Sequence, residues 1–251
     1  METNFSLNHA EYIERNKLLA EENAFSGKAL LEWHKAVIWH CMIRHYSPTQ
    51  WMDYGCGPAF SYQEGEQMHS IIAETNSKEP ILYDPCHEPY NTFPTVESVP
   101  GVVCVDVLEH IPATDTSATL DYLFNVCSEW MFLFISTKRG ARGFINHHES
   151  THCTLKTRQE WVNIVDSYAV SKGIPVVLAT DYVGDSFDHD GKGMTYDHWN
   201  MPVSLVDKIK SSSGVELTNN EAINIEVVRG FRELSEDLNR SLALVSYLQS
   251  L

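Results

Sequence analysis

Five short apolar runs constrain the fold of this chain more than any other feature of its sequence. Within each run, hydrophobic residues follow one another with little alternation, which is typical of strands covered on both faces in a parallel sheet. The runs are WMDYGCG (51–57), PILYDP (80–85), GVVCVDVL (101–108), WMFLFIST (130–137) and GIPVVLAT (173–180). We therefore expect a central sheet that contains these five strands.

The segments between the runs indicate how the sheet is connected. Helical patterns near 61–76, 115–129 and 157–172 alternate with the apolar runs, and this alternation is typical of an open α/β sheet. The link CHEPYNTFPTVESVP (86–100) contains three prolines and little helical pattern, so a full helix-plus-strand unit does not fit there. The predicted fold is α/β and Rossmann-like, with a doubly wound, mostly parallel sheet.

The sequence pattern divides the chain into an N-terminal helical cover (1–45), a Rossmann-like core (46–183) and a C-terminal region (184–251). The cover is expected to hold helices at 8–24 and 27–45. Apolar or weakly polar residues fall at helical spacing in the second of them: Leu30, Leu31, His34, Val37, Ile38 and Cys41.

The C-terminal region is expected to begin as a loop or insert, because residues 181–215 mix glycine, aspartate and aromatic residues. An amphipathic helix should follow, with apolar residues at three- and four-residue steps: Phe231, Leu234, Leu238, Leu242, Val245 and Leu248. We expect this stripe to dock on the core, and the alternative is that it pairs with a second copy of the chain.

Composition limits the partners and the setting. The net charge of −16 repels long nucleic acid, although five of the 18 cations gather in one stretch: Lys138, Arg139, Arg142, Lys156 and Arg158. No apolar run approaches the length of a membrane span, and the first residues lack the layout of a secretory signal. The six cysteines are scattered without a C-x-x-C pair, which favours a reducing, cytoplasmic setting.

Two glycines in DYGCGPA (53–59) predict a tight turn where the first strand ends. Glycine lets the backbone turn and approach a ligand closely, and ligands of open α/β sheets lie at the carboxyl ends of strands. Asp84 closes the second run, where a carboxylate can accept ribose hydroxyls. A plain turn and a nucleotide-cofactor site both fit, and Phe60 stands where the G-x-G-x-x-G pattern has its third glycine.

The segment DVLEH (106–110) places two carboxylates and an imidazole where the third strand is expected to end. Asp106 and Glu109 are three residues apart and His110 follows, so the three share one side of a helical turn. Such groups can act as acid and base, or they can hold a divalent cation such as Mg, Mn, Fe or Zn. The structural alternative is that His110 packs at a helix start.

Taken in order, WMDYGCGPA, ILYDP and GVVCVDVLEHIP resemble the class I S-adenosylmethionine-dependent methyltransferases over about residues 35–180. The resemblance implies that the glycine turn lies under the methionyl part of the cofactor, that the acid after the second strand binds the ribose, and that the third strand end lines the cofactor beside the substrate. The matching residues are Asp53, Gly55 and Gly57, then Asp84, then Asp106. The shortened link at 86–100 departs from the family, and Glu97 is the candidate for its adenine contact.

A later segment, HCTLKTRQEW (152–161), resembles H-x-F-E-W-T-R-x-E-F of the small-RNA 3′-end 2′-O-methyltransferases, with identical spacing. That family binds a divalent metal that contacts the terminal ribose hydroxyls. The metal ligands implied here are Asp106, Glu109, His110 and His152. This chain departs from the pattern at Thr154-Leu155-Lys156, which replace F-E-W, and at Asp106, which replaces a glutamate.

Among the histidines, His110 and His152 are the candidates for a catalytic base, with or without a metal. His147 and His148 are interpreted as part of a polar loop over the site. No role is assigned to His189 or His198, which are interpreted as exposed loop residues.

The function favoured by these patterns is methyl transfer from S-adenosylmethionine to a hydroxyl of a small, hydroxylated or sugar-containing acceptor. Methylation of an RNA 3′-terminal ribose is the first alternative, since the local cations permit a phosphate near the site. A nicotinamide-dependent oxidoreductase is a second, and the missing third glycine counts against it. A non-catalytic cofactor-binding protein is a third, motivated by the shortened link.

Overall fold

The computed structural model describes residues 13, 14, 17, 37, 38, 50–75, 77–138, 151–181, 194–213 and 217–219. The chain divides into two compact units, Met1–Thr218 and Asn219–Leu251, and every described residue except Asn219 belongs to the first. The expected C-terminal helix therefore lies outside the described residues. In the expected N-terminal cover, the described residues Val37 and Ile38 are fully buried, as their place in the apolar stripe predicts.

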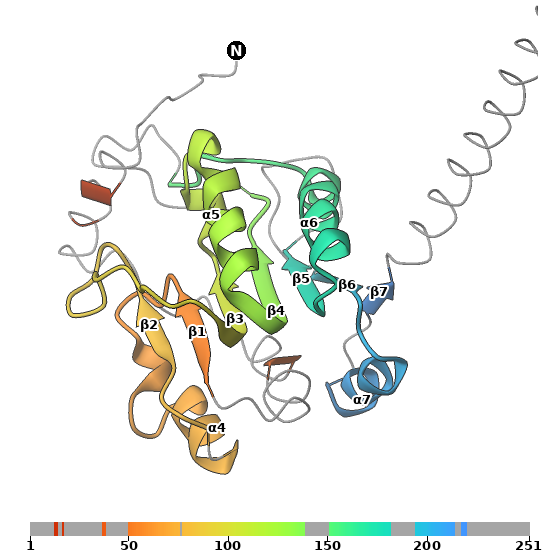
Figure 1. Ribbon diagram of the computed structural model, residues 1–251, viewed down its shortest axis with the longest axis horizontal. Coiled ribbons are helices and arrows are strands. Elements are labelled where there is room, and N and C mark those ends of the chain that lie inside the picture. Colours follow the sequence, from red (N-terminus) through yellow and green to blue (C-terminus); the bar gives the residue numbers. More distant parts are fainter. Residues whose placement is uncertain are drawn as a thin grey trace, which may run out of the picture. The chain divides into compact units, whose positions relative to one another are not determined.

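Seven strands form one mixed sheet within the described part of the chain, in the order β2-β1-β3-β4-β5-β6-β7 (Figure 1). The first five strands in this order run parallel to one another, and β6 is antiparallel to β5. The strands are β1 (Trp51–Tyr54), β2 (Ile81–Tyr83), β3 (Val99–Val105), β4 (Cys127–Ile135), β5 (Val176–Thr180), β6 (Thr195–Trp199) and β7 (Leu217–Asn219). The prediction of an α/β fold with a mostly parallel sheet is confirmed, and each of the five apolar runs contains a strand.

Helices cover both faces of the sheet, which explains why the strands are apolar on both sides. The described helices are α4 (Gln67–Thr75), α5 (Ala113–Val126), α6 (Arg158–Lys172) and α7 (Val203–Ser213). One core packs α5 and α6 against one face, and these two helices lie side by side over it (Figure 1). A second core packs α4 and α7 against the opposite face. No helix of the described residues is both long enough and apolar enough to cross a membrane.

Successive strand residues alternate between the two cores, as the pleat requires. In β4, Met131 and Leu133 belong to the core under α5 and α6, whereas Phe132 belongs to the core under α4 and α7. All three side chains are fully buried. Each such side chain contributes about 1.5–3 kcal/mol through burial of apolar surface, so the double cover is the main source of stability for these strands.

The described part of the 181–215 segment contradicts the loop prediction. Residues 194–213 contain β6 and α7, and His198 lies inside β6 with 3% of its surface exposed. The strand was missed because TYDHW places an aspartate among its aromatic residues. That aspartate, Asp197, is fully buried and pairs with Arg158 of α6, 39 residues earlier in the chain. A partner so distant in sequence leaves no local pattern.

β1 and β3 are parallel neighbours, and the direction in which the chain adds strands to the sheet reverses between them. The chain leaves β1 through α4, on one face, to reach β2, and it leaves β3 through α5, on the other face, to reach β4. The link between β2 and β3 has no helix, as its prolines predict. Ligands of open α/β sheets bind at the carboxyl ends of strands at such a reversal. The candidate site is therefore expected beyond Tyr54 and Val105.

Candidate functional site

The turn after β1 requires glycine at its first position. Gly55 has a φ of 90°, in the region that L side chains rarely adopt, and a Cβ placed there would lie 2.1 Å from Cγ2 of Val107. The N–H groups of Gly55 and Cys56 both donate to the carbonyl oxygen of Tyr83, at 2.7 and 3.1 Å. The turn is thus held against the end of β2 and packed against the segment that follows β3.

Asp84 joins this turn to the end of β2. Its Oδ2 accepts the N–H of Gly57 at 2.9 Å, and its Oδ1 accepts the N–H of Cys86 at 2.8 Å. The ring of His87 lies beside the same Oδ1, with Nδ1 at 3.1 Å. The structure therefore joins the glycine turn to the strand-two acid by a hydrogen bond. Each carboxylate oxygen has two acceptor directions, so Oδ2 retains one for a further donor.

Asp53 lies inside β1 rather than beyond its end. Its side chain is 7% exposed, and its Oδ2 accepts the hydroxyl of Tyr62 at 2.7 Å. Tyr62 closes the 3-10 turn η2 (Phe60–Tyr62), so this hydrogen bond fixes the turn against the strand. The pKa of Asp53 is raised to about 7, and burial is the largest cause. The Tyr62 hydrogen bond acts in the opposite direction, and the neighbouring Asp84 carboxylate adds to the rise.

Asp106 follows β3 directly and has a φ of 61°, a left-handed conformation that is uncommon for residues other than glycine. Its N–H donates to the carbonyl oxygen of Phe134 at 3.0 Å, which extends the pairing of β3 with β4 by one bond. The short 3-10 turn η3 (Leu108–His110) follows at once. Backbone strain of this kind concentrates at functional sites, and here it sets the point where the chain turns away from the sheet.

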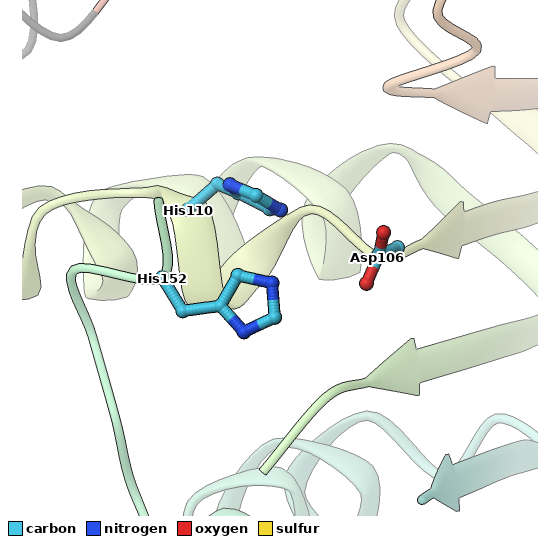
Figure 2. Close-up of side chains that lie close together, drawn as sticks. All are labelled: Asp106, His110 and His152. Carbon is cyan, nitrogen blue, oxygen red and sulfur yellow. The ribbon is translucent and has the colours of Figure 1, made fainter. Parts of the chain in front are cut away.

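Asp106, His110 and His152 form one cluster. Each offers a ligand atom, and these atoms all lie within 4.8 Å of one another. The ring centroids of His110 and His152 are 4.6 Å apart with an interplanar angle of 80°. Figure 2 shows both imidazole rings extending toward the Asp106 carboxylate from two separate segments of the chain. Three of the four residues predicted as metal ligands are thus brought together.

Three hydrogen bonds hold the His152 segment along η3. The Sγ of Cys153 donates to the carbonyl oxygen of His110 at 3.2 Å, and the N–H of Thr154 donates to that of Glu109 at 2.9 Å. The hydroxyl of Thr154 donates to the carbonyl oxygen of Ile111 at 2.5 Å. This alignment places His152 beside His110, although 42 residues separate them in the sequence.

The protonation of the two imidazoles suits a ligand role. Nδ1 of His152 lies 2.6 Å from the carbonyl oxygen of Lys138. Because a carbonyl only accepts, Nδ1 is the donor of this hydrogen bond and Nε2 is the ring nitrogen that can serve as a ligand atom. Burial lowers the pKa of His110 to about 4, partly offset by the Asp106 carboxylate, so His110 is neutral at neutral pH. Two imidazoles and a carboxylate form a donor set that fits a divalent transition metal.

Glu109, the fourth predicted ligand, does not join the cluster. Its side chain is fully buried, and Oε1 accepts the N–H of Ser136 at 2.5 Å. Oε2 is buried and makes no hydrogen bond to the described residues. Burial, and then the charge of Asp106, raise the pKa of Glu109 well above its ordinary value. Glu109 thus links η3 to the end of β4.

Asp181 is a residue that sequence reasoning missed. It follows β5, is 3% exposed, and binds residues that follow β4. The available signal was positional: the run ending in Ser136-Thr137 and the run ending before Asp181 were both predicted strands, and the carboxyl ends of parallel neighbours meet at one edge of the sheet.

The segment TRQEW has clear structural roles. Thr157 and Glu160 form a capping box at the start of α6, in which each side chain binds the backbone of the other. Trp161 is fully buried in the core, and Arg158 pairs with buried Asp197. These residues set where α6 begins.

Of the remaining sequence candidates, the structure describes Glu97. Glu97 is exposed in the link between β2 and β3. His147, His148 and His189 lie outside the described residues.

Comparisons with protein-family models, with curated proteins and with solved structures each found no match to the chain.

Proposed function

We propose that this chain is an S-adenosylmethionine-dependent methyltransferase that methylates a hydroxyl of a small, hydroxylated or sugar-containing acceptor. One observation carries the proposal: two chemically different groups of residues occupy neighbouring strand ends at the reversal between β1 and β3. The first is the glycine turn bound to Asp84, and the second is the cluster of Asp106, His110 and His152.

The first group suits the cofactor. The resemblance to class I methyltransferases implies that this turn passes beneath the methionyl part, and the packing of Gly55 against Val107 holds the turn at the strand end. The remaining acceptor direction on Oδ2 of Asp84 is available to a ribose hydroxyl. Asp53 supports this turn from within β1 through Tyr62. Asp106, at the end of β3, would line the side of the cofactor that faces the acceptor.

The second group suits the acceptor. A sulfonium methyl group is already activated, so the enzyme mainly holds the acceptor oxygen in line with it. As the oxygen–carbon bond forms, the sulfur–carbon bond breaks and the hydroxyl proton leaves. The imidazole of His152, whose Nδ1 lies against the Lys138 carbonyl oxygen, can take that proton through Nε2.

The same residues can hold a divalent metal. Asp106, His110 and His152 would be its ligands, with Glu109 behind them at the end of β4. When bound, such an ion would lower the pKa of an acceptor hydroxyl. Mg, Mn, Fe and Zn are all compatible with carboxylate and imidazole donors.

Of the five clustered cations, Lys138, Lys156 and Arg158 are described, and the ion pairs of Lys138 and Arg158 favour a small acceptor over an RNA end. Arg158 is neutralised by Asp197, and Nζ of Lys138 lies 3.7 Å from Oδ2 of Asp181. Neither is free to bind a phosphate without breaking an internal ion pair. The RNA alternative depends on the spacing from His152 to Thr157 and Glu160, and the last two already serve as a helix cap.

Binding experiments on the purified chain separate the alternatives. We expect S-adenosylhomocysteine to raise the melting temperature and NADH to leave it unchanged. We expect Mn²⁺ to bind, and His152→Ala to weaken that binding at least about tenfold, in the range found for loss of groups around metal sites. His69→Ala, on the exposed face of α4, is the matched control. Stabilisation by NADH alone would overturn the cofactor assignment, and no response to millimolar S-adenosylhomocysteine would favour a non-catalytic protein.

A further inference from the structure

The carboxylate of Asp181 contacts each of the three residues that follow β4. Oδ1 accepts the N–H of Thr137 at 2.8 Å and its hydroxyl at 3.1 Å. Oδ2 accepts the hydroxyl of Ser136 at 2.7 Å and lies 3.7 Å from Nζ of Lys138. One nearly inaccessible carboxylate therefore determines the course of the whole segment 136–138.

That segment in turn holds two residues of the candidate site. The N–H of Ser136 donates to Oε1 of Glu109 at 2.5 Å. The carbonyl oxygen of Lys138 accepts Nδ1–H of His152 at 2.6 Å. Asp181 is thus linked to Glu109 through Ser136, and to His152 through Lys138.

Pairing of the strands does not explain this arrangement. The last pair between β4 and β5 is Ile135 with Thr180, so the contacts of Asp181 lie beyond the paired part of the two strands. What the carboxylate adds is hydrogen bonds to Ser136 and Thr137, the two residues between β4 and Lys138. A buried carboxylate is costly unless its hydrogen bonds are satisfied, and the three bonds made here favour one arrangement of the segment.

We propose that Asp181 is a positioning residue that holds the Lys138 carbonyl in place and thereby keeps His152 in its Nδ1–H form. Imidazole ligands of metals are commonly oriented by such a hydrogen bond from the other ring nitrogen. The use of Nε2 as ligand or base rests on the proposed function, whereas the control of the tautomer does not.

The test compares Asp181→Ala and Asp181→Asn with the parent chain, free of added metal. The first readout is the ¹⁵N spectrum of the His152 side chain, which distinguishes Nδ1–H from Nε2–H. We expect the parent to be Nδ1–H, Asp181→Ala to shift clearly toward Nε2–H, and Asp181→Asn to shift less, since its amide oxygen still accepts from Thr137. Asp197→Asn is the control, because Asp197 is equally buried but lies in the Arg158 pair.

The second readout is the affinity for Mn²⁺ alone. We expect Asp181→Ala to weaken it about 10–100-fold, the range for loss of groups that orient metal ligands, and Asp197→Asn to leave it within about twofold. An unchanged tautomer in a folded Asp181→Ala chain overturns the inference. If Asp181→Ala does not fold, an unchanged tautomer in Asp181→Asn does the same. If the parent binds no Mn²⁺, the metal part of the proposed function fails, and the tautomer still decides the role of Asp181.

Discussion

The N–H of Gly57 donates to Oδ2 of Asp84 at 2.9 Å, so the turn after β1 and the acid after β2 form one hydrogen-bonded unit. Replacing Asp84 by alanine should loosen this turn and remove the acceptor proposed for the ribose. A hydrogen bond to a charged group is worth about 1.5–3 kcal/mol, so we expect S-adenosylhomocysteine to bind at least about tenfold more weakly by calorimetry. Asp121→Ala, at an exposed position of α5, should bind it normally. Equal affinities in both variants would remove Asp84 from the cofactor site.

Two glycines with similar backbone angles should respond differently to alanine. Gly65 has a φ of 86° with no atom near the added Cβ, so Gly65→Ala should cost only the left-handed conformation, roughly 1–2 kcal/mol. Gly55→Ala adds the overlap with Val107 and should cost about 2–5 kcal/mol in all. Urea unfolding measures both values. Val107→Ala should recover part of the loss at Gly55, and no recovery would show that the overlap is not its cause.

The strands and most of the helices were predictable because their signals are local. An apolar run such as that of β4 identifies a strand wherever its partner strands lie. Thr157 and Glu160 indicate the start of α6 from residues only three positions apart. β6 was missed because its character is not local. Asp197 is tolerated in a buried strand only through Arg158, which arrives from another helix.

The candidate site divides in the same way. The glycine turn, Asp84 and Asp106 follow strand ends, so their approach to one another follows from parallel strand order. The place of His152 depends on bonds from Cys153 and Thr154 to the backbone of η3, and no spacing rule predicts those. The hydrogen bond of Glu109 to the N–H of Ser136, which follows β4, is likewise a contact that no spacing rule predicts.

Thr157 should affect stability without affecting binding. Its hydroxyl caps α6, so Thr157→Ala should cost about 1 kcal/mol in urea unfolding, while Thr157→Ser keeps the oxygen and should cost much less. We expect Mn²⁺ and S-adenosylhomocysteine to bind both variants as they bind the parent chain. A loss of binding in Thr157→Ala that exceeds its loss of stability would show that this residue acts on the candidate site as well as on the helix.

Asp53 should make stability depend on pH. Its pKa is about 7 in the folded chain, above its ordinary value of 3.8, because burial disfavours the charged form. Between about pH 4 and 7 the folded state therefore holds a proton that the unfolded state has released. The stabilisation is complete below about pH 4 and is lost as the pH rises to about 7, by at most about 1.4 kcal/mol per pH unit.

Asp53→Asn should remove this dependence, because an amide stays neutral and its oxygen can still accept the Tyr62 hydroxyl. The variant should gain roughly 2 kcal/mol relative to the parent between pH 5 and pH 8, measured as the difference in free energy of unfolding. Asp121→Asn, at an exposed position, should show no such trend. If the difference between Asp53→Asn and the parent is the same at both pH values, Asp53 is ionised in the folded chain throughout this range, and its hydrogen bond to Tyr62 outweighs its burial.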